Sequence, residues 1–145
     1  MNGFELRVRY GDVDAMGWVY YGNYLRWFEI GRAEMLRAMG RTYASIEESD
    51  GVLLPVLEAR CRYLRGARYD ELVRIECGVL RSTRATVTFG YRIVGEDGAR
   101  CAIGHTEHGY ANREAKLVRP PAHLVELLAR APRVDAELAQ ELTGP

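Results

Sequence analysis

The sequence predicts an α+β fold in which a curved antiparallel sheet of about five strands wraps around one long central helix. Three observations predict it. Between residues 25 and 39, apolar residues recur at three- and four-residue steps, which is the spacing of one helical face. After Gly51 the period changes to two in successive segments, as expected for strands with one buried face. The tetrapeptide GEDG at residues 95–98 indicates a hairpin, which makes its two flanking strands antiparallel.

The first elements are a strand, a loop and the long helix. Residues 4–10 alternate and predict a strand, and residues 11–20 form the loop. Asn23 or a glycine beside it is expected to start the helix, and Gly40 is expected to end it. Gly31 lies inside the helix, where it costs about 1 kcal/mol relative to alanine, and this indicates a close approach of helix to sheet. The predicted apolar stripe consists of Leu25, Phe28, Arg32, Met35, Leu36 and Met39.

The remaining elements are long strands and a helical C-terminal segment. Alternating apolar positions run from Leu57 to Tyr63, from Val73 to Val79 and from Ala85 to Ile93. A last strand follows GEDG in ARCAIGHTEHGYAN, and these strands are expected to run about 10–14 residues, roughly twice the usual length. The segment at about 121–142 opens on a Pro-Pro start signal and predicts one or two short helices broken near Pro132.

The chain organisation indicates one domain and a self-associating sheet. Neither a linker nor an internal repeat is present, so residues 1–145 are expected to form a single domain. A sheet wrapped around one helix leaves edge strands exposed, and pairing two copies covers them. We therefore expect a homodimer or a homotetramer.

Composition excludes several classes of function. The chain has 48% hydrophobic and 28% charged residues, and its 20 basic and 20 acidic residues give a net charge of zero. This balance gives no reason to expect a nucleic acid partner. Because no apolar run approaches the ~20 residues of a membrane span and the start has no signal-peptide character, we expect a cytoplasmic protein without membrane insertion. Cys61, Cys77 and Cys101 contain no C-x-x-C pair and predict buried free thiols rather than a zinc site.

The loop GDVDAMG places two aspartates just ahead of the aromatic run WVYYGNYL. A carboxylate there lies close to the start of a helix, where unpaired N–H groups and the helix dipole favour negative charge. Such donors polarise a carbonyl while a carboxylate attacks it or activates a water. Aspartates before helices are also common as caps and turn residues. Spacing alone leaves both interpretations open.

A longer motif carries a resemblance to a known family. The run RVRYGDVDAMGWVYYGNYLRWFEIGRAEML resembles the N-terminal signature of the 4-hydroxybenzoyl-CoA thioesterase-like family. These are hotdog-fold acyl-CoA thioesterases, and they include the thioesterase associated with the Tol–Pal envelope system. RYLRGARYDELVRIE and the Arg-Pro-Pro start of the last helix also match, so the resemblance covers about residues 4–130. The matching motif positions are Tyr10, Asp12, Asp14, Gly17, Val19, Tyr20, Tyr24, Leu25, Phe28, Glu29 and Arg32.

The resemblance implies a hotdog fold and hydrolysis of an acyl-CoA thioester without a cofactor or metal. It implies that Asp14 is the nucleophile or general base and that the main-chain N–H of Tyr21 is the oxyanion donor. Asp12 matches a structural position. The envelope-system branch has a histidine where this chain has Tyr21, and the aromatic version is closer to the 4-hydroxybenzoyl-CoA branch. The identity of the acyl group stays open.

Further substrate contacts are expected around the loop and on a distant turn. Gly17, Trp18, Tyr20 and Tyr24 are expected to line the substrate site. Arg81 and Arg84 flank the turn in LRSTRAT, and arginine suits CoA phosphates because its planar fork donates two hydrogen bonds at once.

Other residues and functions are alternatives. Glu29 and Arg32 are spaced for a structural ion pair on the helix, and Glu34 is expected to be solvated. His105 and His108 are expected on opposite faces of one strand, unable to share a metal, and His123 on the surface. The same fold serves a non-hydrolytic acyl-CoA or acyl-carrier-protein binding module, or a partner module of an envelope complex. A hotdog dehydratase needs a histidine and an acid at one site, and no histidine is near the loop.

Overall fold

The structure is a computed structural model that describes residues 1–144, and Pro145, the last residue of the expected domain, lies outside the described part. A five-stranded antiparallel sheet has the order β1-β3-β4-β5-β2. In this order β1 and β2 are the edge strands. The strands are β1 Asn2–Arg7, β2 Val56–Tyr63, β3 Leu72–Ser82, β4 Thr86–Val94 and β5 Arg100–Gly109.

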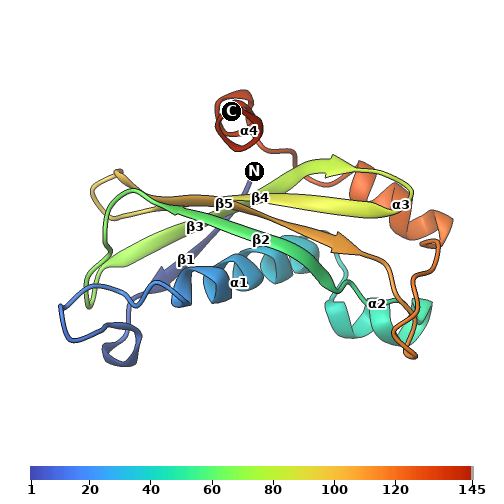
Figure 1. Ribbon diagram of the computed structural model, residues 1–145, viewed down its shortest axis with the longest axis horizontal. Coiled ribbons are helices and arrows are strands. Elements are labelled where there is room, and N and C mark those ends of the chain that lie inside the picture. Colours follow the sequence, from blue (N-terminus) through green and yellow to red (C-terminus); the bar gives the residue numbers. More distant parts are fainter. Residues whose placement is uncertain (145) are drawn as a thin grey trace.

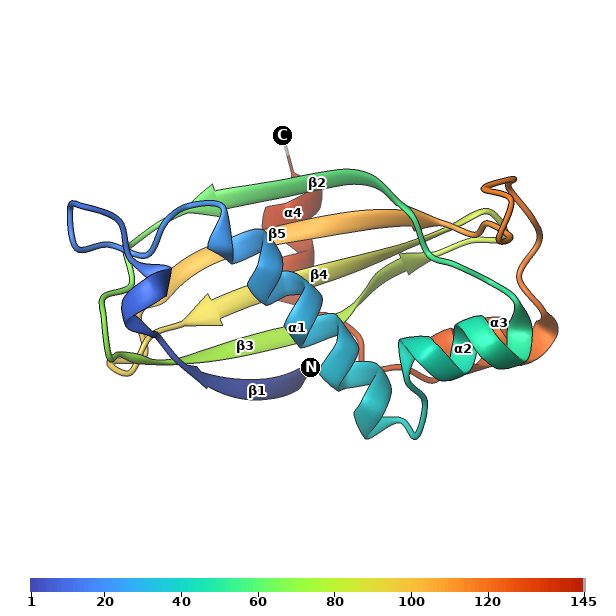
Figure 2. The same ribbon diagram turned by 90° about the horizontal axis from the view of Figure 1, so that it is seen from below.

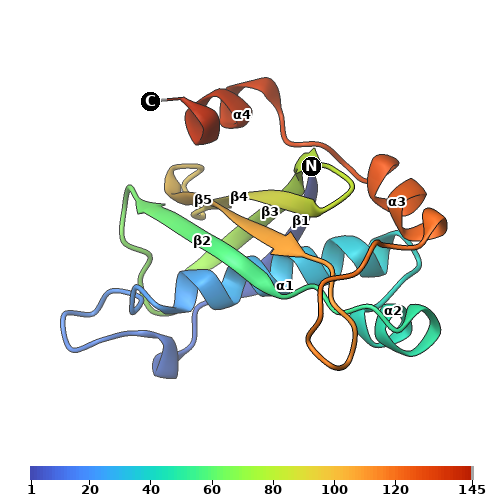
Figure 3. The same ribbon diagram turned by 45° about the vertical axis from the view of Figure 1, so that its right-hand side comes forward.

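Helices lie on both faces of this sheet (Figures 1 and 2). The long helix α1 runs across one face, and the short C-terminal helix α4 lies on the other (Figure 3). Helices α2 and α3 are together at one end of the sheet, and the loop that precedes α1 is at the opposite end. The predicted α+β arrangement is confirmed. The helices are α1 Asn23–Ala38, α2 Tyr43–Asp50, α3 Ala122–Ala129 and α4 Ala136–Thr143, and a 3₁₀ turn spans Tyr10–Asp12.

The core lies between α1 and the central strands. The ring of Phe28 stacks on Tyr91 of β4 with centroids 4.4 Å apart. The alternating positions predicted for β3 and for most of β4 are confirmed as core, because their side chains are fully buried under α1. These are Val73, Ile75, Cys77, Val79, Val87, Phe89, Tyr91 and Ile93.

The ends of α1 and the role of its glycine agree with the sequence. The helix begins at Asn23, directly after Gly22, and Gly40 follows it with a φ of +85°. A Cβ placed on Gly31 would lie 2.6 Å from Cγ2 of Ile75 on β3. Helix and sheet therefore approach each other too closely for any larger residue here, as the sequence indicates.

The stripe predicted for α1 is wrong at its first turn. Leu25 is 42% exposed, and the buried face begins instead with Tyr24 and Trp27. The reason is a tertiary contact, since the Tyr24 hydroxyl accepts a hydrogen bond from the Ala67 N–H and its ring meets Tyr63. The spacing of apolar residues within the helix carries no information about a partner elsewhere in the chain.

Two further differences concern α2 and the strand lengths. Helix α2 is absent from the sequence prediction, although Thr42 and Ser45 form a capping box and Gly51 ends the helix at φ +64°. The long strands run 8 to 11 residues, so β2 and β4 are shorter than predicted. Ala85 lies in the exposed turn before β4 rather than in the strand, because Thr83 and Thr86 close that turn with hydrogen bonds.

The C-terminal helices form as predicted, with Pro132 between them. The segment that joins them crosses the sheet face opposite α1, where a Cβ on Gly90 would lie 2.7 Å from Cγ1 of Val134. The cysteines are free thiols, with Cys77 and Cys101 buried and Cys61 half-buried. Within residues 1–144, no helix combines the length and the apolar character needed to cross a bilayer.

Candidate active site

The loop before α1 folds into a short hairpin whose turn starts at Asp14. The Asp14 N–H donates to the Trp18 carbonyl at 2.8 Å, and the Gly17 N–H donates to the Asp14 carbonyl at 3.0 Å. Val13 and Val19 form an isolated antiparallel bridge beneath this turn. Gly17 has a φ of +84°, a conformation that glycine adopts without the steric cost of a Cβ. This turn explains why a glycine stands at this position.

The Asp14 carboxylate has one oxygen engaged and one open. Oδ1 accepts the Met16 N–H at 2.8 Å, as in the Asx turns that aspartate favours. Among the described residues, Oδ2 has no hydrogen-bond partner, and the residue is only half-buried. Asp14 therefore does serve as a turn residue, which is one of the two roles that the sequence leaves open for it. The free oxygen leaves the carboxylate able to contact a water or a substrate as well.

Asp12 is held on all sides by its own chain. It is 8% exposed, its Oδ2 accepts the Arg9 N–H at 2.8 Å, and its Oδ1 lies 3.6 Å from Nη2 of Arg26. Its carbonyl accepts the Tyr20 N–H at 2.8 Å and the Asn23 Nδ2 at 2.9 Å. These bonds tie the 3₁₀ turn to the start of α1, which fits the structural role that the resemblance implies.

The start of α1 offers two N–H donors. In the described part of the chain, the main-chain N–H groups of Tyr21 and Gly22 have no acceptor, whereas that of Asn23 donates to the Tyr20 carbonyl at 2.9 Å. The helix dipole adds partial positive charge at this end. Together these groups form a site suited to a carbonyl oxygen that gains negative charge.

Three aromatic residues, Trp18, Tyr20 and Tyr21, belong to the same loop as these donors. Tyr20 and Tyr21 are 47% and 63% exposed, and their rings lie 4.6 Å apart. The Trp18 ring lies against Gly66, and the guanidinium of Arg68 stacks 3.8 Å from the centre of that ring. Of the residues predicted to line the substrate site, Trp18 is half-buried and Tyr20 is exposed in this loop.

Tyr24, in contrast, lies in the core at 2% exposure, with its ring 5.1 Å from Trp27 and its hydroxyl on the Ala67 amide. Burial raises the pKa of Tyr24. Tyr63, for which the sequence predicts only a place in a strand, contacts both this buried tyrosine and Tyr21 through its ring. Its contact with the motif joins residues 42 positions apart, and no pattern in the sequence signals it.

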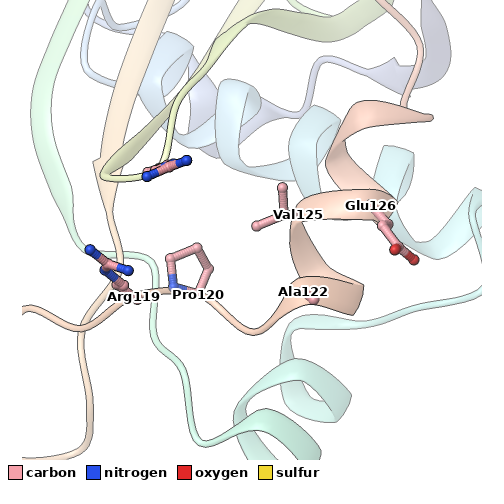
Figure 4. Close-up of a pocket in the computed structure, with 6 residues that line it drawn as sticks. Arg119, Pro120, Ala122, Val125 and Glu126 are labelled. Carbon is pink, nitrogen blue, oxygen red and sulfur yellow. The ribbon is translucent and has the colours of Figure 1, made fainter.

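Arg81 and Arg84 are not brought to the loop within one chain. Arg81 lies nine residues beyond Leu72 along β3, about 30 Å at the usual rise per residue, and its Nη2 contacts Glu107 Oε2 at 3.3 Å. Arg84 lines a hollow of about 370 Å³ beside α3. Figure 4 shows Arg119 and Pro120 on one side of this hollow and Val125 on the other. The hollow is therefore lined both by guanidinium groups and by apolar side chains.

A second hollow, which the sequence does not predict, lies where the chain passes from α2 into β2. It measures about 550 Å³ and is apolar. Leu57 and Leu117 on its rim are 53% and 76% exposed. The lining residues are Leu53, Leu54, Pro55, Leu57, Ala111, Ala115 and Leu117.

The competing acids and histidines occupy other places. Arg32 forms no ion pair with Glu29 within residues 1–144, so that prediction is wrong; it donates instead to Tyr43 and, at 2.9 Å, to Tyr91. The helix turns Arg32 inward and leaves Glu29 exposed. Glu34 is not simply solvated, since it pairs with Arg37.

The histidines lie apart from the loop. His108 packs edge-on against Phe89 on the α1 side of the sheet, whereas His105 contacts Glu58 at 3.0 Å on the other face, as predicted. His123 is at the surface, 2.6 Å from Asp50 Oδ1. The described residues contain no cluster of three or more His, Cys, Asp or Glu side chains arranged for a metal ion.

Comparison with known proteins agrees with this architecture. The family model described as the thioesterase-like superfamily matches residues 8–142. A protein of Aquifex aeolicus, named only as a candidate esterase, is 32% identical over 125 residues, which cover 86% of this chain and 95% of that protein. The acyl-CoA thioesterase YbgC of Haemophilus influenzae is 35% identical over 95 residues, covering 64% of this chain and 70% of its own.

A solved structure confirms the hotdog fold. The DHNA-CoA thioesterase of Staphylococcus aureus is similar with a TM-score of 0.83 and 28% identity, and the match covers 88% of each chain. The family match begins just after β1 and spans the loop before α1, strands β2 to β5 and nearly all of the C-terminal segment. This chain therefore belongs to the thioesterase-like superfamily.

Proposed function

We propose that the protein hydrolyses an acyl-CoA thioester to the free acid and CoA at the loop that joins Asp14 to the start of α1. The observation that carries this proposal is that one loop contains an open carboxylate oxygen and two main-chain N–H groups that have no acceptor among residues 1–144. A general base or nucleophile and an oxyanion site are the two parts that this hydrolysis uses.

In this mechanism the thioester carbonyl oxygen accepts hydrogen bonds from the N–H groups of Tyr21 and Gly22. As a general base, Asp14 takes a proton from water while the water oxygen bonds to the carbonyl carbon; the C–S bond then breaks, and the proton passes to the CoA thiolate. As a nucleophile, Asp14 displaces the thiolate itself and forms an anhydride that water hydrolyses. Both routes use the same oxyanion site and need no metal or cofactor.

We also propose that two copies pair along the free edge of β2. This edge strand carries apolar side chains at 43–54% exposure, namely Val56, Leu57, Tyr63 and, just beyond it, Leu64. Antiparallel pairing of two such edges places the loop end of one copy beside the α2 end of the other. The apolar hollow at Leu57 then lies near the loop of the second copy, in a position to receive the acyl group, and the Arg81–Arg84 end approaches it as well.

The pairing has a direct test. The protein should sediment as a particle of at least twice the 16.4 kDa of one chain. Leu57→Asp should shift it toward the monomer, because a charge would be desolvated at the new interface. A wild-type protein that sediments as a monomer at micromolar concentration would contradict the pairing.

Hydrolysis is tested by following free thiol with a panel of short, long and aromatic acyl-CoAs. The panel includes 1,4-dihydroxy-2-naphthoyl-CoA, because a hydrolase of this substrate from Thermosynechococcus vestitus is 26% identical to this chain over 108 residues. Release of CoA from one class of acyl-CoA in preference to the others is the expected result. We place the reaction in the cytoplasm, in keeping with the free cysteines.

A non-hydrolytic acyl-CoA or acyl-carrier-protein binding module is the second candidate. The observation in its favour is that Oδ1 of Asp14 is already engaged by the Met16 N–H in the turn. Tight binding of an acyl-CoA with no thiol release from any member of the panel would identify this function and reject hydrolysis.

A further inference from the structure

The main-chain donors at the start of α1 sit in an exposed part of the chain. Tyr20 and Tyr21 are 47% and 63% exposed, and the N-cap residue Gly22 offers no side-chain hydrogen bond to the helix. An oxyanion site contributes to catalysis only when its donors are already aimed, since reorganisation during the reaction removes the benefit. Something outside the loop is therefore needed to hold these peptides in place.

A side chain from the edge strand does so. The Tyr63 hydroxyl donates a hydrogen bond to the Tyr21 carbonyl oxygen at 3.0 Å, across 42 residues of sequence. The same carbonyl accepts the Tyr24 N–H at 3.3 Å. Two donors on one carbonyl fix the plane of the peptide that joins Tyr21 to Gly22, and the N–H of Gly22 belongs to that plane.

The Tyr63 ring is itself held by two edge-to-face contacts. Its centroid lies 5.3 Å from that of Tyr24 at 80° and 6.4 Å from that of Tyr21 at 83°. Tyr24 is buried, so the hydroxyl of Tyr63 projects from a fixed base toward the loop. Burial raises the pKa of Tyr63 to about 12, so at neutral pH the hydroxyl keeps the proton that it donates.

We propose that Tyr63 is a positioning residue of the oxyanion site, which aims the free N–H group of Gly22 through its bond to the Tyr21 carbonyl. The bond also withdraws electron density from that peptide and strengthens its N–H as a donor. In this role Tyr63 acts through the peptide and not on the thioester or the water. The inference rests on the proposed hydrolysis, because an oxyanion site has meaning only for that reaction.

The test compares Tyr63→Phe with Tyr69→Phe. The first change removes the hydroxyl and keeps the ring and its contacts. The second removes the hydroxyl of a tyrosine that is 56% exposed in the next loop and has no part in the site. With the best acyl-CoA of the panel, Tyr63→Phe should lower kcat about tenfold, less than the ~10²–10³ that loss of a whole oxyanion donor costs. Its KM should stay within a factor of about two, and Tyr69→Phe should change neither constant.

A second readout reports on the bond itself. In ¹⁵N-labelled protein, Tyr63→Phe should shift the Gly22 amide resonance, because its peptide loses an acceptor bond at the carbonyl, while residues of β3 and β4 keep their shifts. A Gly22 shift with unchanged kcat would overturn the inference, and so would a raised KM at constant kcat, which would assign Tyr63 to binding. No thiol release by the wild type would overturn the proposed hydrolysis and this inference with it. Hydrolysis by the wild type with equal kcat in Tyr63→Phe overturns the inference alone.

Discussion

Asp14→Asn should lower kcat for acyl-CoA hydrolysis by a factor of about 10²–10⁴ if the carboxylate acts as a general base. A larger loss is expected if it acts as the nucleophile, because an amide forms no anhydride with the acyl group. KM should change little, since the aromatic residues and the helix start are untouched. Steady-state thiol release over a range of acyl-CoA concentrations measures both constants.

The substitution is chosen to leave the loop intact. An asparagine Oδ1 accepts the Met16 N–H as the aspartate does, so the turn that starts at residue 14 should survive. Asp97 provides a matched control, because its Oδ1 accepts the Ala99 N–H at 3.0 Å in the same i to i+2 arrangement, in the hairpin between β4 and β5. Asp97→Asn should keep full activity. If Asp14→Asn also keeps full activity, position 14 serves the turn alone.

The second large effect concerns stability in acid. A directional chain of hydrogen bonds crosses the core from α1 to β5. Arg32 donates to the Tyr91 hydroxyl at 2.9 Å, and Tyr91 lies 2.6 Å from the hydroxyl of Thr106. That hydroxyl lies 2.8 Å from Nε2 of His108, and Nδ1 of His108 lies 3.0 Å from the Leu54 carbonyl. Since a carbonyl only accepts, Nδ1 carries the proton and Nε2 accepts from Thr106.

The neutral form of His108 is therefore the one that the core accommodates. Burial, followed by the nearby charge of Arg32, lowers the pKa of His108 from 6.5 to about 4. The unfolded chain binds this proton near pH 6.5 and the folded chain only near pH 4. The contribution is thus complete above pH 6.5 and is lost as the pH falls toward 4. The shift corresponds to about 3 kcal/mol in the free energy of unfolding.

Urea unfolding at several pH values between 4 and 7 measures this contribution. The wild type should lose more stability on acidification than His108→Gln, which has no imidazole to protonate. His123→Gln removes a surface imidazole instead. Because it keeps His108, its free energy of unfolding should fall on acidification as that of the wild type does. Parallel stability curves for the wild type and His108→Gln over this range would contradict the assignment.

Local pattern and chemistry determined much of the architecture. The period-two runs identified the buried positions of β3 and β4, because alternate side chains of a strand necessarily face opposite sides of the sheet. Gly40 marked the end of α1, because only glycine adopts its left-handed conformation without cost. Gly31 indicated a close approach of α1 to the sheet, where it contacts Ile75. Glycine is unfavourable inside a helix, so its presence there indicates a position where a side chain does not fit. These inferences need only the residue and its neighbours in the chain.

Only the tertiary structure determined the contacts between residues that are distant in sequence. The inward turn of Tyr24 depends on Ala67 and Tyr63, the partners of Arg32 are tyrosines rather than Glu29, and the apolar hollow joins the chain before β2 to the chain after β5. The bond from Tyr63 to the Tyr21 carbonyl belongs to the same class. Periodicity records which face a side chain takes on its own element. It does not record which element packs against that face, because the path of the chain in space sets that choice.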